Sequence, residues 1–422
     1  MQYLQRVFDK ILAEKLEASD AVLIEGPKWC GKTTTAEQIA ESVLYMQRPE
    51  TQDENMRVAQ VAPSALLRGR TPRLIDEWQV APNLWDAVRF EADKRQQFGQ
   101  FILTGSTVPP KAGQTRHSGT GRIARMKMRT MSLFESQDSS GAVSLASLFA
   151  GDCLPISDSG SDIEELAFLL CRGGWPRAVG KSERVALQQA RNYLDAVVES
   201  DISEVDGVGR DAQRARHIMR SYARFTSSQG KISNMVADLL ESDAASDADT
   251  VRSYLCALRS LFVIEELAAW NPNLRSKTAL RTTGTRHFCD PSIAAAALAA
   301  TPAALMRDFD TFGLLFESMC IRDLRSYAQA LDGSVFHYRD SAGLECDAVI
   351  CLKDGRYALV EVKLGGQALV EEGIASLCKL RAKIDTDKMG APAFMMVLTG
   401  TGKMSYPSEE GVFIVPVKTL GP

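Results

Sequence analysis

The sequence predicts an α/β protein that begins with a parallel sheet, continues through a helical middle region and ends in a second α/β unit. Three patterns predict this organisation. Short apolar runs alternate with helical spacing before residue 135, helical spacing dominates residues 163–298, and period-two strands follow a long helix after residue 312. Strands that alternate with helices are typical of parallel sheets covered by helices. The 422 residues suffice for about two to four domains.

The composition is that of a globular protein, with 45% hydrophobic and 24% charged residues. It excludes a disordered, collagen-like or fibrous chain. A formal net charge of -4 excludes a uniformly basic nucleic-acid coat but permits a local basic surface. No apolar run approaches the ~20 residues of a membrane-spanning helix. The nine cysteines form no CxxC pair, so we expect reduced thiols and a cytoplasmic protein.

Individual elements follow from periodicity and turn residues. In the first 135 residues, strands are expected at residues 21–24, 73–75 and 100–103, and helices at residues 34–44 and 84–95. Residues 136–162 are rich in Ser, Gly and Asp, and we interpret them as a linker with one short apolar segment. Later elements are a helix at 312–331, strands at 335–338, 344–352 and 357–364, a helix at 370–383 and a strand at 393–398.

A glycine-rich loop between a predicted strand and a predicted helix carries the most specific signal. Residues 26–33 read Gly-Pro-Lys-Trp-Cys-Gly-Lys-Thr and fit GxxxxGK[ST]. Glycines let backbone N–H groups surround an anion, Lys32 would bind the β- and γ-phosphates, and the Thr33 hydroxyl would reach Mg²⁺. The pattern predicts a site for ATP and Mg²⁺. The residues expected to contact the nucleotide are Gly26, Pro27, Lys28, Trp29, Cys30, Gly31, Lys32, Thr33, Thr34, Thr104 and Ser106.

Carboxylates follow the second predicted strand. Asp76 would hold the water shell of Mg²⁺ and Glu77 would polarise the attacking water, although an ordinary acidic pair at a strand end is the alternative. Thr104 and Ser106 follow the third strand, where they would contact the γ-phosphate or form a simple polar turn. Arg122 is a candidate for stabilising transferred charge, within the chain or on a neighbour; a solvated basic face is the other interpretation.

A second set of acids lies near the C-terminus. Period-two geometry places Glu361 and Lys363 on one face of a strand, and Asp347 lies on the strand that precedes it across a hairpin. Glu317 lies on the apolar side of the long helix. Clustered carboxylates repel unless a divalent cation or a lysine relieves them, so this set predicts a metal site with Glu317, Asp347 and Glu361 as ligands. A structural salt bridge is the alternative.

The middle region has the pattern of a winged helix: three helices, marked by residues 218–225, 232–239 and 251–258, and then a strand at 261–267. Arg252 and Arg259 would be exposed on the third helix. The segment 271–287 contains Arg275, Lys277, Arg281 and Arg286 and no acidic residue. Such a wing would lie along the phosphates of double-stranded DNA. A helical lid whose arginines face solvent is the alternative.

These motifs together resemble known families. The loop, the Asp76-Glu77 pair and the polar strand end at 103–106 resemble the AAA-type P-loop ATPases. Residues 171–176, Cys-Arg-Gly-Gly-Trp-Pro, are similar to a motif of bacterial and archaeal ATP-binding proteins in which such a domain is joined to a nuclease-like domain. Asp347, Glu361 and Lys363, with Glu317 as a helical acid, resemble the PD-(D/E)xK nuclease fold, although no proline precedes Asp347. The resemblance implies a restriction-endonuclease-like domain, a winged-helix-like segment and assembly into homo-oligomers.

We therefore expect four regions: an AAA-type P-loop ATPase core at 1–135, a linker and helical lid at 136–212, a winged-helix-like segment at 213–298 and a nuclease-like domain at 299–422. The expected catalytic residues are Lys32, Glu77, Arg122, Glu361 and Lys363, and the expected metal ligands are Thr33, Asp76, Glu317, Asp347 and Glu361. The primary hypothesis is an ATPase whose nucleotide state controls a DNA-facing module and a nuclease-like domain. The alternatives are a non-hydrolysing switch with an inert scaffold and a small-molecule P-loop kinase.

Overall fold

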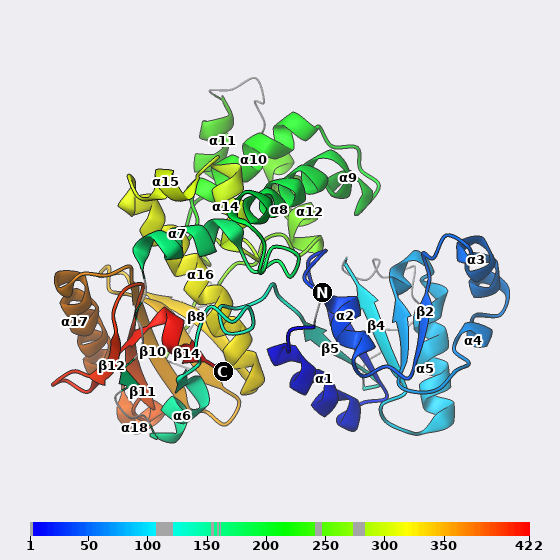
Figure 1. Cartoon of the computed structure of the whole chain (residues 1–422), viewed down its shortest axis with the longest axis horizontal. Helices are drawn as coiled ribbons and strands as arrows, with labels where there is room; N and C mark the ends of the chain where they lie inside the picture. Colours follow the sequence, from blue (N-terminus) through cyan, green and yellow to red (C-terminus); the bar gives the residue numbers. More distant parts are fainter. Residues whose placement is uncertain are drawn as a thin grey trace. The chain divides into compact units, whose positions relative to one another are not determined.

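The computed structural model describes residues 3–106, 121–152, 156–157, 160, 162–240, 247–272 and 283–422. The chain divides into two compact units (Figure 1). The first comprises Met1–Thr130 with Ser260–Phe262, and the second comprises Met131–Arg259 with Val263–Pro422. In the described residues, no helix combines the length and apolarity needed to cross a bilayer.

The sheet of the first unit is parallel, with the strand order β2-β3-β4-β1-β5 among the described residues. Its strands are β1 (Ala21–Glu25), β2 (Ser42–Tyr45), β3 (Arg73–Asp76), β4 (Phe101–Gly105) and β5 (Ile123–Lys127). Its helices are α1 (Val7–Ala18), α2 (Lys32–Glu37), α3 (Gln52–Val61), α4 (Pro63–Leu66), the 3-10 turn η1 (Trp78–Val80) and α5 (Asn83–Arg95). The predicted strands that became β1, β3 and β4, and the predicted helix that became α5, are confirmed.

The helix predicted at 34–44 is wrong in its second half. α2 ends at Glu37, and the residues of β2 instead pair in parallel with β3, Val43 opposite Leu74 and Leu44 opposite Ile75. The apolar spacing here fits a helix and a strand equally over so short a run. Pairing with a neighbouring strand satisfies the backbone and decides between them.

Apolar side chains fix the register of this sheet. Leu23, Ile75 and Leu103, one from each of β1, β3 and β4, belong to a single buried cluster. The same cluster includes Trp78 and Trp85, whose ring centroids lie 4.9 Å apart. The resulting register places the carboxyl ends of β1, β3 and β4 at one edge, where parallel α/β sheets carry their ligand sites.

The second unit has a helical part. It comprises α7 (Ile163–Arg172), α8 (Glu183–Ala196), the π-helical turn η2 (Val197–Asp201), α9 (Ile202–Glu204), α10 (Ala212–Arg224), α11 (Ile232–Leu240), α12 (Ala248–Ser260), α14 (Pro291–Ala297), α15 (Pro302–Leu305) and α16 (Phe309–Ala330). Its long helix α16 packs against α7, α14 and α15. The three helices expected in the middle region are confirmed as α10, α11 and α12. The strand expected at 261–267 is wrong, because Phe262 has a left-handed φ of 58° and only isolated bridges follow, Ile264 to Phe288 and Leu267 to Thr285.

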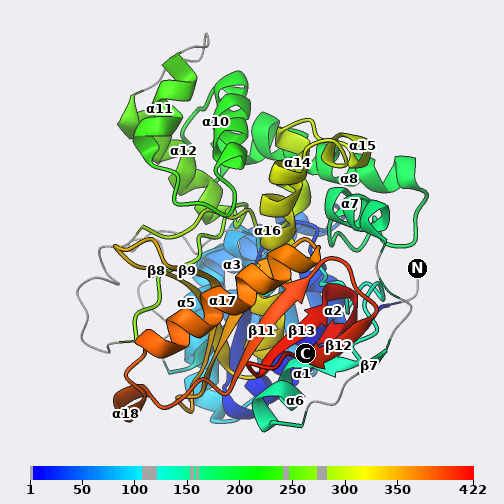
Figure 2. The same ribbon diagram turned by 90° about the vertical axis from the view of Figure 1, so that its left-hand side faces the viewer.

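The second unit also contains a mixed sheet, with the order β7-β12-β13-β11-β10-β9-β8 in the part of the chain described. Its strands are β7 (Ile156–Ser157), β8 (Gly333–Arg339), β9 (Glu345–Leu352), β10 (Tyr357–Lys363), β11 (Phe394–Thr399), β12 (Met404–Pro407) and β13 (Val412–Pro416). The helices α16 and α17 (Gln367–Lys383) lie on opposite sides of this sheet, and the short α18 (Thr386–Met389) follows (Figures 1 and 2). The elements expected between residues 312 and 398 are confirmed.

The segment 136–162 differs from the linker that we expected. It contains β6 (Val143–Ser144) and α6 (Leu145–Ala150), and it supplies β7 to the mixed sheet. β6 pairs with β14 (Leu420–Gly421), which follows the 3-10 turn η3 (Val417–Thr419). Phe149 packs edge-on against Phe394 with ring centroids 5.0 Å apart. The Ser and Gly content predicted a linker, but Val143, Leu145, Leu148 and Phe149 are buried and help to fix it to the C-terminal sheet.

A network of buried charges connects separate chain segments of the second unit. The Arg322 guanidinium lies 3.0 Å from Asp290 and 2.8 Å from Asp323, and all three side chains are at most 3% exposed. Asp290 accepts a hydrogen bond from the Gly174 backbone at 2.9 Å, and Asp323 accepts one from the Leu133 backbone at 3.0 Å. Four chain segments therefore converge on one ion network. Removing a single partner from such a network leaves an uncompensated buried charge.

Gly174 allows a close backbone approach in this network. Its carbonyl accepts a hydrogen bond from Met131 N at 2.7 Å, and an added Cβ would lie 2.0 Å from the Met131 carbonyl oxygen. We predict that Gly174→Ala lowers the free energy of unfolding of the second unit by about 1–3 kcal/mol, measured by urea titration. Gly209→Ala is the matched control, because its Cβ would meet nothing within 4 Å. Equal unfolding midpoints for the two variants would contradict the packing described here.

Candidate nucleotide site

The glycine-rich loop connects β1 to α2 at the carboxyl edge of the first sheet. Gly26 has a φ of 155° and Gly31 a φ of 101°. An added Cβ at Gly26 would lie 2.1 Å from the Met128 carbonyl oxygen. Both positions therefore require glycine, one for a close backbone approach and both for a φ that L side chains rarely adopt.

Lys32 lies inside the loop. Its side chain is 6% exposed, and Nζ donates to the carbonyl oxygens of Gly26 at 2.9 Å and Pro27 at 2.8 Å. The ammonium group is thus held by neutral carbonyls and has no carboxylate partner among the residues described. A buried cation without a counter-ion favours an anionic ligand.

Five of the predicted residues come together at the carboxyl ends of β3 and β4. Asp76 Oδ1 accepts hydrogen bonds from Thr33 Oγ1 and from Thr104 Oγ1, each at 2.7 Å. One residue further, Glu77 has a left-handed φ of 55°, which turns it out of the strand direction. Ser106 Oγ donates to Glu77 Oε2 at 3.4 Å. The hydroxyl and carboxylate oxygens of Thr33 and Asp76 are the ligand type that Mg²⁺ prefers, so this pair fits the ion.

The remaining loop residues differ in what they can offer a ligand. Cys30 is fully buried and its Sγ faces the Met128 carbonyl at 3.9 Å, so only its backbone is available. Pro27 has no N–H group to donate. Trp29 is 45% exposed and has a left-handed φ of 66°. Lys28 is half-buried and Thr34 is exposed.

Within its own chain, Arg122 is misplaced for the role that we predicted. Its carbonyl accepts a hydrogen bond from Ala21 N, at the start of β1. The loop lies at the other end of that strand, about 13 Å away at ~3.3 Å per residue. The Arg122 side chain pairs with Asp93 at 2.7 Å, and this ion pair holds the pKa of Arg122 above its usual value. Residue type predicted an anion ligand, but strand direction was not considered.

Sequence reasoning missed the N-terminal segment, which braces the loop. Arg6 is 4% exposed and donates from Nη1 to the Cys30 carbonyl at 2.8 Å and from Nη2 to the Arg129 carbonyl at 2.9 Å. On the other side of the loop, the Tyr3 hydroxyl lies 3.0 Å from Thr35 Oγ1. No motif marks these residues. The only signal was that a charged residue directly precedes an amphipathic helix.

The second predicted cluster also assembles, in the C-terminal sheet. β9 and β10 pair antiparallel up to Ala348 opposite Val360, and Asp347 then accepts a hydrogen bond from Val362 N at 2.8 Å. Lys363 Nζ lies 3.2 Å from Glu361 Oε2. Asp347 and Glu361 thus lie on adjacent strands at the point where the ladder opens.

Burial sets the charge state of this cluster. Burial and then the negative charge of Asp347 raise the pKa of Glu361 to about 8, and Lys363 opposes them. Burial, followed by the charges of Asp347 and Glu361, raises the pKa of Glu317 well above its usual value. Burial also raises the pKa of Asp347. Among the described residues, no group of three or more His, Cys, Asp or Glu side chains is arranged to hold a metal ion. A site here would rest on the Asp347–Glu361 pair, and Mg²⁺ often uses only one or two carboxylates.

The arginines expected to face DNA are mostly engaged within the protein. Arg286 is 4% exposed, donates to the Gly230 carbonyl at 2.6 Å and pairs with Glu266 at 3.0 Å. The expectation that it lies along phosphates is wrong, because the folded segment buries it over Tyr222. Arg259 pairs with Glu266 and the more exposed Arg252 pairs with Asp249. Arg275, Lys277 and Arg281 lie outside the described residues.

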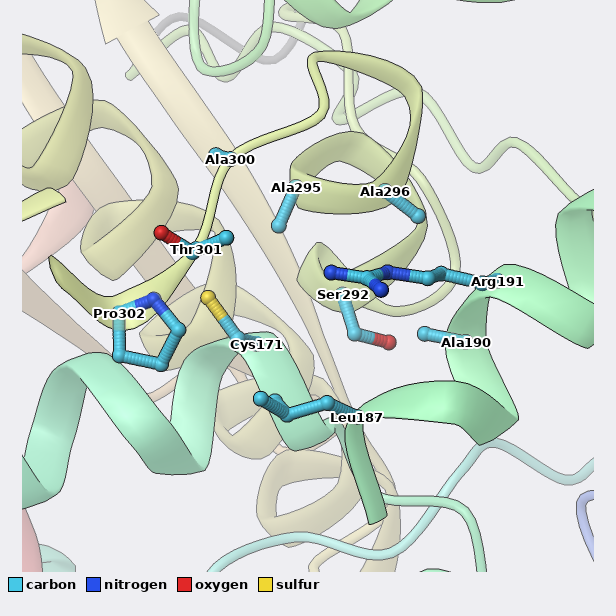
Figure 3. Close-up of a pocket in the computed structure, with 10 residues that line it drawn as sticks. All are labelled: Cys171, Leu187, Ala190, Arg191, Ser292, Ala295, Ala296, Ala300, Thr301 and Pro302. Atoms are coloured by element: carbon cyan, nitrogen blue, oxygen red, sulfur yellow. The ribbon is translucent and has the colours of Figure 1, made fainter. Parts of the chain in front are cut away.

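A pocket in the second unit lies between α7, α8 and α14 (Figure 3). Its volume is about 240 Å³, part of it open to solvent, which is below the ~300–1,000 Å³ typical of small-molecule sites. The Cys171 thiol and the Arg191 guanidinium reach into it. Burial raises the pKa of Cys171 to about 12, so this thiol is protonated near neutral pH. The pocket therefore offers no thiolate and little room for a ligand.

Three parts of the chain match known domain families. Residues 18–137 match a family described as "AAA domain". Residues 163–304 and 312–420 match two families that are each described as a domain of unknown function, DUF8612 and DUF4143. The first match, together with the geometry of the loop, supports an AAA-type P-loop ATPase fold for this part of the chain. This part of the predicted fold class is confirmed.

The similar proteins add little about activity. The uncharacterised proteins Mb2031c of Mycobacterium bovis and Rv2008c of Mycobacterium tuberculosis are each 26% identical over 285 residues, which cover 65% of this chain and 57% of theirs. The chain thus spans little more than half the length of these relatives. The Walker-type ATPase PABY2304 of Pyrococcus abyssi is 13% identical to this chain. The match covers 68% of this chain and 94% of that protein, with a TM-score of 0.41. The RuvB Holliday junction branch migration motor of Thermotoga maritima is 17% identical and covers 61% and 87%, with a TM-score of 0.24.

We predict that Arg6→Met frees the loop without unfolding the sheet, because the Cys30 carbonyl loses a charged donor whose hydrogen bond contributes about 1.5–3 kcal/mol. Hydrogen–deuterium exchange of peptides that cover residues 26–33 should become at least about tenfold faster, while exchange in β4 stays unchanged. Arg57→Met, on the exposed side of α3, is the control. Unaltered loop exchange in Arg6→Met would show that the brace is dispensable.

Proposed function

We propose that this protein binds ATP with Mg²⁺ at the loop of residues 26–33 and hydrolyses it. The observation that carries the proposal is the convergence of Thr33 and Thr104 on Asp76 beside the buried ammonium group of Lys32. These groups come from α2, β3 and β4, and only the parallel register of the sheet brings them to one place. The match to an AAA domain supports adenine over guanine as the base.

Each residue has a distinct task in this proposal. Lys32 exchanges its two carbonyl partners for β- and γ-phosphate oxygens and neutralises charge that develops during transfer. Thr33 and Asp76 would hold Mg²⁺, which when bound neutralises part of the phosphate charge. Thr104 keeps the Asp76 carboxylate oriented. Glu77 accepts a hydrogen bond from the attacking water and so orients it toward the γ-phosphorus.

We predict that Glu77→Gln keeps ATP affinity but lowers the ATPase turnover number by at least about a hundredfold, because the amide is a poor base for water. Phosphate release under saturating Mg·ATP measures this. Glu14→Gln changes an exposed glutamate of α1 and is the control. Wild-type turnover in Glu77→Gln would mean that hydrolysis does not use Glu77. A wild-type protein that binds ATP without hydrolysing it would favour the non-hydrolysing switch.

A second candidate function belongs to the carboxylate cluster of the mixed sheet. We propose metal-dependent cleavage of DNA there, with Asp347 and Glu361 as ligands, Glu317 as an accessory acid and Lys363 as the group that stabilises charge on the phosphate. The specific support is that three acids with pKa values raised by burial and a lysine share one place. The inert-scaffold alternative keeps the same residues as a structural ion pair. In this proposal the winged-helix-like segment at 213–298 contacts the DNA, and ATP occupancy of the first unit controls cleavage.

We predict that Mg²⁺-dependent cleavage of double-stranded DNA disappears in Asp347→Asn and in Glu361→Gln, since either change removes a ligand charge. Glu372→Gln is the control: its side chain is 69% exposed and lies 3.8 Å from the same lysine. A gel assay with circular and linear substrates, with and without ATP, measures the effect. Cleavage that survives both ligand substitutions would contradict this site, and no cleavage by the wild type would favour the inert scaffold.

A further inference from the structure

Gln79, which no motif marks, lies between the two strand ends that carry the proposed catalytic groups. It belongs to η1, two residues after Glu77, and its Nε2 donates a hydrogen bond to Glu77 Oε2. Ser106 Oγ, at the end of β4, donates to the same oxygen at 3.4 Å. In the described part of the chain, the other carboxylate oxygen, Oε1, accepts no hydrogen bond from a protein group.

We propose that Gln79 is a positioning residue that orients the Glu77 carboxylate for activation of the attacking water. The proposal rests on the proposed ATPase function and assigns it a residue that the motifs do not contain. Gln79 occupies Oε2 and so leaves Oε1 to accept the hydrogen bond from water. Gln79 itself has no contact with the nucleotide in this scheme and acts only through Glu77.

The backbone conformation explains why Glu77 needs a residue that orients its side chain. Glu77 has a left-handed φ of 55°, so the chain leaves the direction of β3 at this residue. A glutamate side chain that is free to rotate loses rotamer entropy when it takes one orientation. Two hydrogen bonds to one oxygen fix that orientation before the nucleotide arrives. Such preorganisation raises the rate of the chemical step without tightening substrate binding.

Packing fixes Gln79 in turn. An added Cβ at Gly105 would lie 3.0 Å from Gln79 Oε1 and 3.1 Å from Trp78 Nε1. Trp78 is fully buried and packs on Trp85, so it cannot move away. A methyl group at residue 105 would therefore displace the Gln79 amide. Gly105→Ala and Gln79→Leu should therefore both lower the turnover number. The first adds a methyl group to β4, and the second removes a hydrogen-bond donor from η1.

The test compares steady-state ATPase kinetics of the full chain. For Gln79→Leu and for Gly105→Ala we expect the turnover number to fall about tenfold or more while KM for Mg·ATP stays within about twofold. Gln60→Leu, at an exposed position of α3, is the matched control and should behave as wild type. Circular dichroism and urea unfolding of each variant establish that it is folded.

A double-mutant cycle separates positioning from a structural role. In the Glu77→Gln background, adding Gln79→Leu should change the single-turnover rate by less than about twofold, because the group that Gln79 orients is already gone. Three results would overturn the positioning role. They are an equal loss of single-turnover rate in the wild-type and Glu77→Gln backgrounds, a rise in KM with a constant turnover number, and faster turnover in Gln79→Leu. An active wild type with an unaffected Gln79→Leu defeats this inference alone, whereas an inactive wild type defeats the proposed ATPase and the inference with it.

Discussion

The parallel register of β1, β3 and β4 is the constraint on which the nucleotide site depends. Asp76 lies opposite Thr104 in that register, and Glu25, which precedes the loop, lies opposite Gly105. A slip of one residue in β3 would turn Asp76 to the other face of the sheet and separate it from Thr33. The buried cluster of Leu23, Ile75 and Leu103 opposes such a slip, because it would move Arg73 or Asp76 into a position that Leu74 or Ile75 now fills in the core. The apolar core thus positions the polar site.

In the second unit, a network of buried charges holds separate chain segments in place. Arg322 and its two aspartates connect the segment before α6, the loop after α7, the start of α14 and the long helix α16. α16 also carries Glu317, so the helix that anchors this network faces the acids of the mixed sheet as well. Burial raises the pKa values of these acids, so the cluster favours either protons or a cation.

Short-range signals in the sequence predicted the loop of the first unit and the carboxylate beside it, but not their surroundings. The loop could be predicted because glycine and lysine at fixed spacing have one physical use, and Asp76 because a carboxylate ends a buried strand. Arg122 failed as a ligand within its own chain because residue type gives no strand direction. No sequence pattern marks Arg6, because its role depends on the backbone carbonyls that it contacts. Gln79 was missed because the position of its side chain depends on packing beside the neighbouring strand β4. The segment 136–162 was misjudged because a few buried apolar residues outweigh a polar composition. The role of the carboxylate cluster stays a prediction.

Isothermal titration calorimetry of ATP with Mg²⁺ into the purified full chain tests the central claim most directly. The account predicts saturable binding to the wild type, and an affinity about 10–100-fold weaker in Lys32→Ala, since a charge-assisted hydrogen bond contributes about 1.5–3 kcal/mol. Lys10→Ala, whose side chain is 81% exposed, should bind as the wild type does. No binding heat from a folded wild type at several temperatures, or equal affinities of the wild type and Lys32→Ala, would contradict the account.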